Sequence, residues 1–492
     1  MTFARAAGLV SALALGLAVS SCRFRIDSVV VPLDDGGTGQ PDLSLADLSG
    51  ADLSTPDDLP ALCSNSGPTS ACSADGTMLL SCQGNVPVPA ACEDGCSATP
   101  TPHCKHLEPS GAADPGDYTL AGLLAVSISG TGTINSETGE INAPPIVRGA
   151  GMGVDQGIGF RLAAQADGST IGVFSFGTLT IVDNALLNVV GHRPIALVAN
   201  GDIIVSGAID VQGTCMPGTT VAGGGAGGAP KLGTGNSGGG MGAGQGGTNA
   251  TGGGGGGGGG GHGDVGGKGA TTSVTANAGG AGGVVFGDLT MDDPAISGGG
   301  GGAAGGGALA TATGGQGGSG GGALQLVSNH QLTLASTAIL QAGGCHGEPS
   351  LTSTGGGGGG GAGGAILLEA RTIVVNNTAA IVANGGAGAG GGPGAAGGDG
   401  DQDASRAKGG LGGTKGTDGG DGGHTTSLFG QPGSAPNGST LFGGGGGGSV
   451  GRIALKSKTG TVSTAGAVLS PIIGEFSAGQ MPPATSTIAK FK

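Results

Sequence analysis

The sequence predicts an all-β protein: a parallel β-helix, or solenoid, whose rungs are separated by long glycine-rich insertions and preceded by a small disulfide-rich module. Three observations lead to this prediction. Glycine supplies 122 of the 492 residues, whereas tryptophan is absent and tyrosine occurs once. Short apolar runs of β type recur between glycine tracts from about residue 118 onward, and six cysteines fall within residues 63–104. With so few aromatic side chains, one conventional large core is excluded.

The N-terminus has the pattern of a targeting segment rather than of a folded element. Arg5 gives a positive start, and the apolar run that follows, Ala6 to Val19, is too short to cross a bilayer as a helix. The run ends in Val19-Ser20-Ser21-Cys22, which resembles a bacterial lipobox. The resemblance implies a lipoprotein signal peptide at residues 1–21 and lipidation of Cys22. An ordinary cleaved signal peptide with a chance cysteine is the alternative.

Location and partners follow from the flanking residue and the charge. Arg23 stands where such lipoproteins often carry the Asp that retains them in an inner membrane, so the resemblance implies the outer membrane or cell surface. We therefore expect the membrane to be a partner through the N-terminal lipid. A formal charge of −15 with few Lys and Arg argues against nucleic acid, because its binding needs clustered positive charge.

Residues 22–62 are acidic and contain proline, and Asp-Leu-Ser recurs in them at residues 42, 47 and 52. So few copies cannot stack as a solenoid, and Pro56 and Pro60 interrupt the pattern. The segment is therefore predicted to be a disordered stalk.

Residues 63–107 are predicted to be a disulfide module. Exported proteins meet an oxidising compartment, and the spacing lacks the CxxC pairs of a typical zinc site. Six cysteines allow many pairings, and the sequence alone does not choose among them. The cysteines of this module are Cys63, Cys72, Cys82, Cys92, Cys96 and Cys104.

Residues 118–475 are assigned to the solenoid because four segments superpose, at 195–215, 324–345, 366–387 and 453–470. Each shows three short strands with tight turns, as one rung of a β-helix would. A single rung leaves its backbone groups unpaired, whereas stacked rungs pair every strand and align Ile, Leu and Val inside. A β-sandwich is the competing fold, and residues 476–492 are assigned to a C-terminal tail. The third strands are expected to begin at Ala208, Ala338, Ala380 and Ala467, and the last second strand is expected at Thr461-Val462.

The repeat also predicts a disulfide. Cys215 and Cys345 each stand seven residues after the start of an expected third strand, at Ala208 and Ala338. Neighbouring rungs lie about 4.8 Å apart, which a disulfide tolerates. We therefore expect a Cys215–Cys345 bridge.

The insertions at about 216–322, 346–364 and 388–448 include ten consecutive glycines at Gly252–Gly261. Two alternatives stay open for them. Glycine's large unfolded entropy favours mobile loops. Extended threefold polyglycine helices could instead hydrogen-bond side by side, since no side chain keeps the backbones apart.

In composition, the rungs and insertions together resemble PGRS-like glycine-rich proteins of bacterial envelopes and β-helical adhesins. The run Phe174–Ile181, followed by Arg193–Val198, is similar to the opening of glycine-rich surface lipoproteins of myxobacteria. The likeness covers about residues 118–470 and rests on repetition. It implies a structural or adhesive surface role and no catalytic residue.

No catalytic motif is identified. Glycine-based matches to a nucleophile elbow lie between no strand and helix, and no phosphate loop is complete. Asp399, Asp401 and Asp403 alternate like the first ligands of a calcium-binding loop. Ala404 stands at the sixth position, where such a loop has glycine, so the three aspartates are only a weak calcium candidate. Asp202 and Asp210 fall in different strands of one rung and make an unconvincing acid–base pair.

The sequence thus predicts a non-enzymatic, lipid-anchored surface protein, structural or adhesive, with no cofactor and no firm metal site. A carbohydrate-active or carbohydrate-binding β-helix protein is the alternative, with an extracellular polysaccharide as its partner.

Overall fold

The structure is a computed structural model, and the all-β prediction is confirmed in the part of the chain that it describes. There the sole helical element is the short 3-10 helix η1 (Pro115–Tyr118), and no helix has the length and apolar character to cross a membrane. The predicted signal peptide, Cys22 and the predicted stalk lie outside the described residues. The described residues are 63, 70–84, 86–216, 218–250, 252–274, 278–288, 291, 295–308, 312–352, 354–474 and 483–492.

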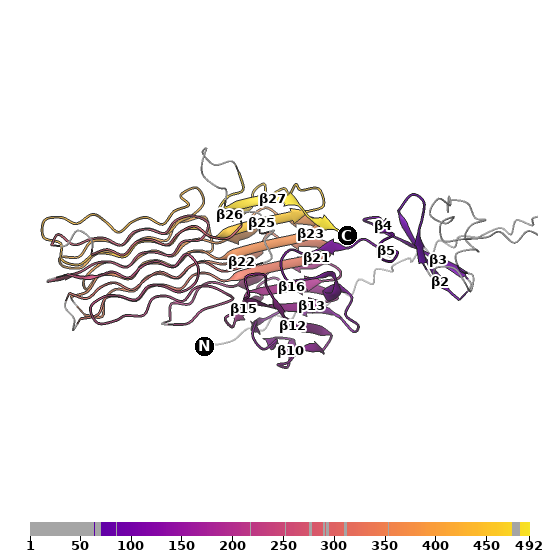
Figure 1. Cartoon of the computed structure of the whole chain (residues 1–492), viewed down its shortest axis with the longest axis horizontal. Helices are drawn as coiled ribbons and strands as arrows, with labels where there is room; N and C mark the ends of the chain where they lie inside the picture. Colours follow the sequence, from indigo (N-terminus) through magenta and orange to yellow (C-terminus); the bar gives the residue numbers. More distant parts are fainter. Residues whose placement is uncertain are drawn as a thin grey trace, which may run out of the picture.

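Three parts follow one another along the long axis (Figure 1): a cysteine-rich module at one end, β-sheets in the middle and a bundle of glycine-rich segments at the other end. The module holds an antiparallel sheet of β1 (Ser70–Cys72), β2 (Met78–Gln83) and β3 (Val86–Ala91). A second small pair, β4 (Cys96–Ser97) with β5 (His103–Cys104), completes it.

The middle part consists of two large sheets in which most strand pairs are parallel. The first runs β11-β12-β13-β16-β21-β17-β14-β7, with β23, β25 and β27 added beside β21. Its strands are β7 (Ala125–Ile128), β11 (Gly153–Asp155), β12 (Ile158–Ala164), β13 (Thr170–Phe176), β14 (Thr178–Ile181), β16 (Ile195–Ala199), β17 (Ile203–Val205), β21 (Ala323–Leu334), β23 (Ala365–Val375), β25 (Arg452–Ser457) and β27 (Ala484–Ile488).

The second sheet runs β10-β9-β8-β15-β18-β22-β24-β26. Its strands are β8 (Thr131–Asn135), β9 (Ile141–Ala143), β10 (Ile146–Arg148), β15 (Leu186–Val190), β18 (Ala208–Asp210), β22 (Ile339–Gln341), β24 (Ala380–Val382) and β26 (Val468–Ser470).

The first strands of the four repeats pair in the register that the sequence alignment expects. Ile195 pairs with Leu324, Leu324 with Ile366, and Ile366 with Ile453, all in parallel. The expected first and second strands of two repeats are continuous, because β21 and β23 each cover both. The repeats are therefore stacked neighbours, although long insertions separate them in the sequence.

Three strand expectations were wrong. Ala208 pairs with Ile339, and Ala380 with Val468, so the third strands of the second and fourth repeats begin one residue later than Ala338 and Ala467. This register places Ile209, Leu340 and Ile381 side by side, and all three are fully buried. Thr461-Val462 forms no strand.

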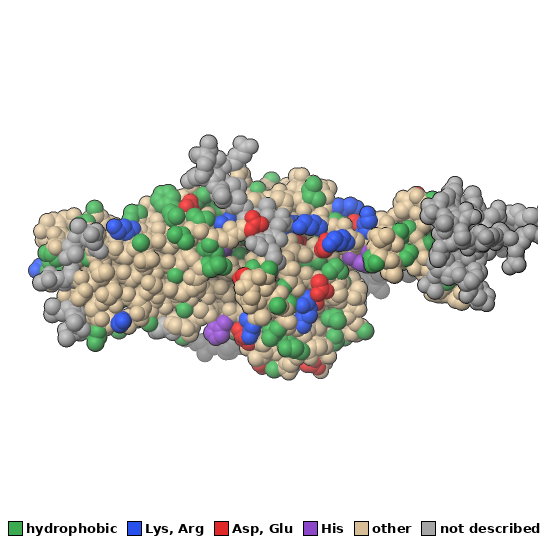
Figure 2. Space-filling model, viewed as in Figure 1, with side chains coloured by type: hydrophobic (Ala, Val, Ile, Leu, Met, Phe, Trp, Pro, Cys, Tyr) green, Lys and Arg blue, Asp and Glu red, His purple; other side chains and the backbone are tan. Residues whose placement is uncertain are grey.

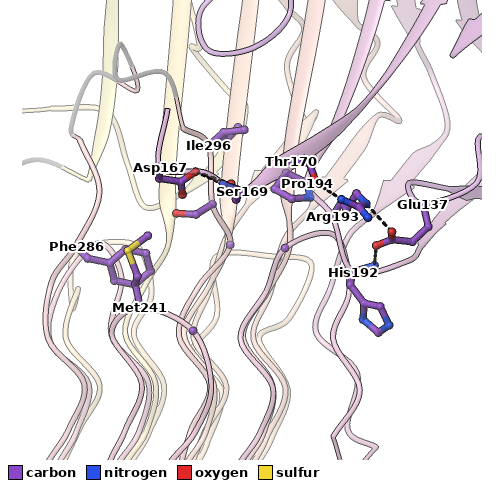
Figure 3. Close-up of a pocket in the computed structure, with 14 residues that line it drawn as sticks. Glu137, Asp167, Ser169, Thr170, His192, Arg193, Pro194, Met241, Phe286 and Ile296 are labelled. Atoms are coloured by element: carbon purple, nitrogen blue, oxygen red, sulfur yellow. Dashed lines mark hydrogen bonds and ion pairs between the residues drawn. The ribbon is translucent and has the colours of Figure 1, made fainter. Parts of the chain in front are cut away.

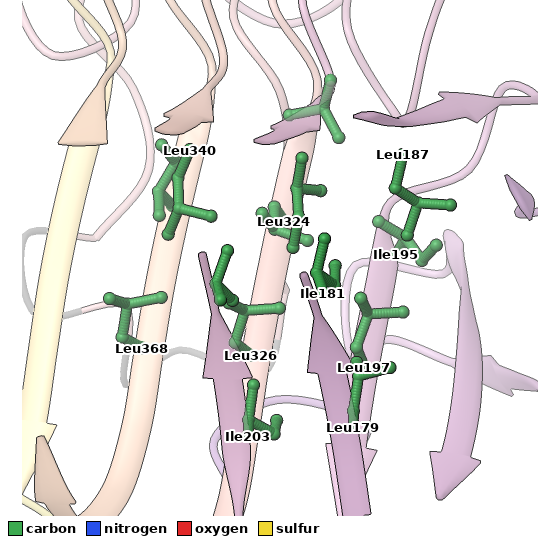
Figure 4. Close-up of a cluster of buried hydrophobic side chains, with 14 of the residues drawn as sticks. Leu179, Ile181, Leu187, Ile195, Leu197, Ile203, Leu324, Leu326, Leu340 and Leu368 are labelled. Atoms are coloured by element: carbon green, nitrogen blue, oxygen red, sulfur yellow. The ribbon is translucent and has the colours of Figure 1, made fainter. Parts of the chain in front are cut away.

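The main core takes its side chains from both sheets (Figure 4). Leu187 and Leu340 come from the second sheet, while Leu197 and Leu326 come from the first, and all four are at most 1% exposed. Each is an aliphatic residue at an alternating position of a strand, so stacking the repeats places aliphatic side chains next to one another. Burial of these side chains holds the sheets together.

The C-terminal residues pair with the sheets and with the segment that follows the cysteine module. Residues 483–492, assigned to a tail from the sequence, instead supply β27, which pairs with β25, and β28 (Lys490–Phe491). Strand β28 pairs antiparallel with β6 (Leu107–Glu108), which follows the cysteine module. The C-terminal residues thus fasten the segment that leads from the module to the sheets.

A buried polar network fixes the same segment. Glu369 of β23 and Lys456 of β25 are 1% and 2% exposed. A Glu369 carboxylate oxygen accepts from the Ser110 hydroxyl at 2.6 Å, and Lys456 Nζ donates to the same hydroxyl at 2.7 Å. Gln325 of β21 donates to the other Glu369 oxygen at 2.7 Å. Lys456 Nζ also lies 4.0 Å from a Glu369 carboxylate oxygen, so the two buried charges compensate each other and Ser110 bridges them.

The substitution Lys456→Met should destabilise the protein by about 3–5 kcal/mol, because it leaves the Glu369 carboxylate buried without its cation. Equilibrium unfolding in denaturant would measure the change. Lys492→Met is the matched control: it removes the exposed lysine that pairs with Glu108 and should cost less than about 1 kcal/mol. Equal losses in the two variants would contradict the role given to the buried network.

The glycine-rich insertions lie side by side as extended segments along the long axis (Figure 1), and Figure 2 shows few charged side chains on their visible face. The tract 254–261 illustrates the packing. Successive N–H groups donate in rotation to three neighbours: Gly255 and Gly258 to the segment 245–248, Gly256 and Gly259 to 267–270, and Gly257 and Gly260 to 357–360. Its carbonyl groups accept from three further segments, at 280–283, 300–306 and 443–449. The hydrogen bonds to any one neighbour therefore recur at every third residue.

At Gly256 and Gly257 this packing leaves no room for a side chain. A Cβ added to Gly257 would lie 2.1 Å from the carbonyl oxygen of Ala303, and one added to Gly256 would lie 1.9 Å from that of Gly444. Both obstacles are backbone atoms that are themselves hydrogen-bonded within the bundle, so they cannot rotate away. Glycine is required here by the close approach of backbones.

Gly257→Ala should therefore destabilise the protein by about 1–3 kcal/mol or more, as overpacking does in a dense core. Gly438→Ala provides the control, because nothing lies within 4 Å of a Cβ at that position. It should change the free energy of unfolding by no more than about 0.5 kcal/mol. Thermal and denaturant unfolding of the two variants would be compared, and a harmless Gly257→Ala would refute the close packing.

Candidate functional site

The structure pairs all eight cysteines that the sequence analysis assigned to disulfides. In the module the bridges are Cys63–Cys82, Cys72–Cys96 and Cys92–Cys104. Between the repeats, Cys215 is joined to Cys345, with a Cα–Cα distance of 5.4 Å. The last bridge lies where the first two insertions leave the second sheet, and it joins positions 130 residues apart in the sequence.

Two polar side chains surround the Cys215–Cys345 bridge, and we call these four residues the cysteine corner: Cys215, Cys345, His346 and Asp399. Cys215 Sγ lies 3.4 Å from His346 Nδ1 and 3.2 Å from Asp399 Oδ1. Cys345 is fully buried, whereas the other three are partly exposed. In the described part of the chain this is the group of metal-binding donor types whose atoms all lie within 4.8 Å of one another.

Hydrogen bonds hold the imidazole of His346 on both sides. Nδ1 lies 2.6 Å from Asp399 Oδ1, and Nε2 lies 3.1 Å from a carboxylate oxygen of Glu348. The bond to Asp399 raises the pKa of His346, although burial acts in the opposite direction. Burial alone would raise the pKa of Asp399, but the hydrogen bond and charge of His346 leave it below its usual value. The pair therefore favours an imidazolium next to a carboxylate.

The three aspartates of the weak calcium candidate share one hollow. Asp399, Asp401 and Asp403 line a space of about 620 Å³ together with Gln212 and Gln341, and Asp399 also belongs to the cysteine corner. Burial, followed by the charges of Asp403 and Asp399, raises the pKa of Asp401. Asp401 and Asp403 are not part of the convergent donor group. Calcium binding by the three aspartates stays a prediction.

A second candidate site lies where the bundle meets the sheets (Figure 3), and we call it the junction pocket. Its volume is about 580 Å³. Turns between strands supply Glu137, Asp167 and Arg193, whereas the returning glycine segments supply Met241 and Phe286. One wall is therefore polar and the other apolar.

The charged side chains of the junction pocket already have hydrogen-bond partners. Arg193 Nε donates to Glu137 Oε2 at 2.5 Å, and Arg193 also contacts the Thr170 hydroxyl. The other Glu137 oxygen accepts from the backbone N–H of His192 at 3.0 Å. Asp167 accepts from Ser169. The pocket thus offers fixed polar groups beside an aromatic ring, which is the composition of a small-ligand site.

Behind the pocket, the bundle holds a histidine that is 1% exposed. His262 stacks on Phe286 with ring centroids 4.6 Å apart, and its Nδ1 lies 2.9 Å from the carbonyl oxygen of Gly363. Burial, together with nearby Arg452, lowers the pKa of His262 to about 3. The ring is therefore neutral, with Nδ1–H donating, and supports Phe286 from behind.

Sequence reasoning found only part of these sites. Cys215, Cys345 and Asp399 were singled out, but for separate reasons, and His346 was missed although it directly follows Cys345. The junction pocket draws on residues scattered from 137 to 298, which no local pattern would connect. Asp202 and Asp210 have separate partners: His330 contacts Asp202, and the backbone N–H of Gln212 donates to Asp210.

In comparisons with known proteins, no family model, no curated protein and no solved structure matches this chain.

The free energy of unfolding should fall as the pH is lowered from 6.5 toward 3. Over this range the unfolded chain protonates His262, whereas the folded protein keeps it neutral, so protons favour the unfolded state. The effect should be on the order of a few kcal/mol. His262→Gln should flatten this slope, and at about pH 8 the two proteins should differ only by the lost packing. An unchanged slope in the variant would show that another group governs the acid sensitivity.

Proposed function

We propose that this chain is a non-enzymatic, lipid-anchored protein of the outer membrane or cell surface, with a structural or adhesive role. In this proposal, Cys22 carries the lipid and residues 22–62 form a stalk. The folded part is a parallel β-helix that carries a bundle of polyglycine II helices. The observation that carries the proposal is that the glycine tract 254–261 forms hydrogen bonds with six neighbouring segments.

Two features support the β-helix interpretation. Successive repeats pair in parallel, both through their first strands and through their third strands. Aliphatic side chains from both sheets occupy one interior between them. A stacked solenoid accounts for both, because each repeat buries its apolar residues only against its neighbours.

The threefold hydrogen-bond period supports the polyglycine II interpretation. An extended helix with three residues per turn directs successive N–H groups toward three different neighbours. A segment that donates to three neighbours and accepts from three others sits inside a laterally packed array. Such a bundle uses glycine to build stiffness, which suits a protein that holds a surface away from a membrane.

The order of the parts along the chain supports an orientation in which the glycine bundle points away from the membrane. The cysteine module comes first in the described chain and lies at the end opposite to the glycine bundle (Figure 1). With an anchor at Cys22, the bundle would point away from the membrane. Its outer turns carry exposed apolar side chains, among them Leu232, Val274 and Leu351, the last of which is 95% exposed. These turns are the contact points of the proposed adhesive role.

The carbohydrate-binding alternative has one observation in its favour. The junction pocket places the Arg193–Glu137 pair and Asp167 opposite Phe286, and sugars bind where polar side chains face an aromatic ring. Titration of the purified protein with oligosaccharides would test this alternative. Binding that is lost in Phe286→Ala would favour it over a purely structural role.

The variant Cys22→Ser should lose the lipid and move from the membrane fraction to the soluble fraction of the producing cells. Detergent phase partitioning and mass spectrometry of the N-terminal peptide would measure the shift. Ser20→Ala is the matched control, because it keeps a small residue at a lipobox position and should stay membrane-bound. Protease treatment of intact cells should remove the wild-type protein if it faces outward. A Cys22→Ser variant that stays in the membrane fraction would refute the anchor.

A further inference from the structure

The cysteine corner has the donor atoms of a metal site and a geometry near to one. Ligands of tetrahedral zinc at about 2.3 Å for sulfur and about 2.0–2.1 Å for nitrogen lie about 3.5 Å from one another. In the corner, His346 Nδ1 lies 3.4 Å from Cys215 Sγ and 3.9 Å from Cys345 Sγ. Cys215 Sγ lies 3.2 Å from Asp399 Oδ1. Two pairs are closer than a metal would set them: the bonded sulfurs, and His346 Nδ1 with Asp399 Oδ1, which are hydrogen-bonded at 2.6 Å.

The surroundings of His346 also suit a metal ligand. A metal-bound imidazole typically donates its second N–H to a carboxylate, which fixes the orientation of the ring. His346 has this arrangement, because Nδ1 faces the two sulfurs while Nε2 lies 3.1 Å from Glu348. The Asp399 side chain is 41% exposed, so a cation and a small reductant can reach the corner.

The charge balance of the corner depends on the disulfide. While the bridge is closed, the sulfurs are neutral and Asp399 faces His346. When it opens, two thiols form, and their ionisation would place two thiolates beside the carboxylate in a space where the donor atoms lie within 4.8 Å. A divalent cation would compensate this accumulation of negative charge, which the single imidazolium does not.

We infer that, once the Cys215–Cys345 disulfide is reduced, Cys215, Cys345, His346 and Asp399 bind one Zn²⁺ ion. A dithiol reductant supplies two electrons and two protons, so the S–S bond breaks, two thiols form and the reductant becomes a disulfide. Zn²⁺ then displaces one proton from each thiol and the Nδ1 proton of His346. The disulfide and the zinc complex exclude each other, and either one ties the two insertions together. This site is independent of the proposed anchor and adhesive role.

The donor set selects the metal class. Thiolates and imidazole favour Zn²⁺ over hard cations, which prefer oxygen ligands. The corner is therefore chemically distinct from the calcium site considered for Asp399, Asp401 and Asp403. In the zinc complex Asp399 would supply the single carboxylate.

Site-specific alkylation tests the inference on the purified full chain. The protein is reduced with dithiothreitol, freed of the reductant under anaerobic conditions and alkylated with and without excess Zn²⁺. Peptide mapping then gives the rate for each cysteine, so the cysteines of the module are followed separately. Zinc should slow the alkylation of Cys215 and Cys345 by about tenfold or more, because a metal-bound thiolate is a poor nucleophile.

Variants separate ligands from bystanders. His346→Gln should abolish the protection, and Glu348→Gln should weaken zinc affinity by about 10- to 100-fold, as loss of an outer carboxylate does. His330→Gln, which alters a half-exposed histidine bonded to Asp202, is the matched control and should behave like the wild type. With Co²⁺, a thiolate-to-metal charge-transfer band should appear and be weaker in the double variant Cys215→Ser, Cys345→Ser.

Several outcomes would overturn the inference. Equal alkylation rates with and without zinc would do so, whether the thiols fail to bind or reduction unfolds the corner. Protection that persists in His346→Gln, or equal protection by Ca²⁺, would also reject it. Loss of membrane anchoring in Cys22→Ser has no bearing on this result.

Discussion

Direct contact between polypeptide backbones is the constraint on which the molecule depends. In the bundle, the space that side chains would fill is taken by carbonyl oxygens, as at Gly256 and Gly257. Each tract gains little from apolar burial and loses much conformational entropy, so its stability rests on hydrogen bonds formed with many neighbours at once. The bundle therefore needs a template that starts every segment in place. The two sheets provide it, because successive repeats release their insertions at one end.

The sheets and the bundle stabilise each other. Aliphatic side chains such as Leu197 and Leu340 hold the sheets together and set the spacing of the repeats. The insertions leave the sheets at that spacing and keep it along the bundle. The Cys215–Cys345 bridge sits at the transition, where apolar packing gives way to backbone pairing. At the opposite end of the sheets, Glu369, Lys456 and Ser110 fasten the segment that leads to the cysteine module. A disulfide therefore stabilises the junction of the sheets with the bundle, and a buried polar network stabilises the junction with the cysteine module.

The sequence was informative where side chains alternate. The first strands at Ile195, Leu324, Ile366 and Ile453 could be aligned because large aliphatic residues mark the inward positions. The start of the third strand was misplaced by one residue at Ala338 and Ile339. Alanine and isoleucine fit either face of a strand, and a small residue gives little signal of which face it occupies. The sequence left a bundle and mobile loops as equal alternatives, because glycine has no side chain to show a period, and it could not show that Gly257 pairs with Gly357. The cysteine corner was missed as a unit for a similar reason, since Asp399 reaches it through a separate insertion.

The direction of the glycine segments has a mechanical consequence. They run along the long axis and turn back at the outer end (Figure 1), so each outer turn joins two antiparallel segments. A tensile load on such a turn would act parallel to the segments and perpendicular to the hydrogen bonds between them. Those bonds would be sheared together instead of being peeled apart one by one. The bundle is therefore built to resist extension along its axis.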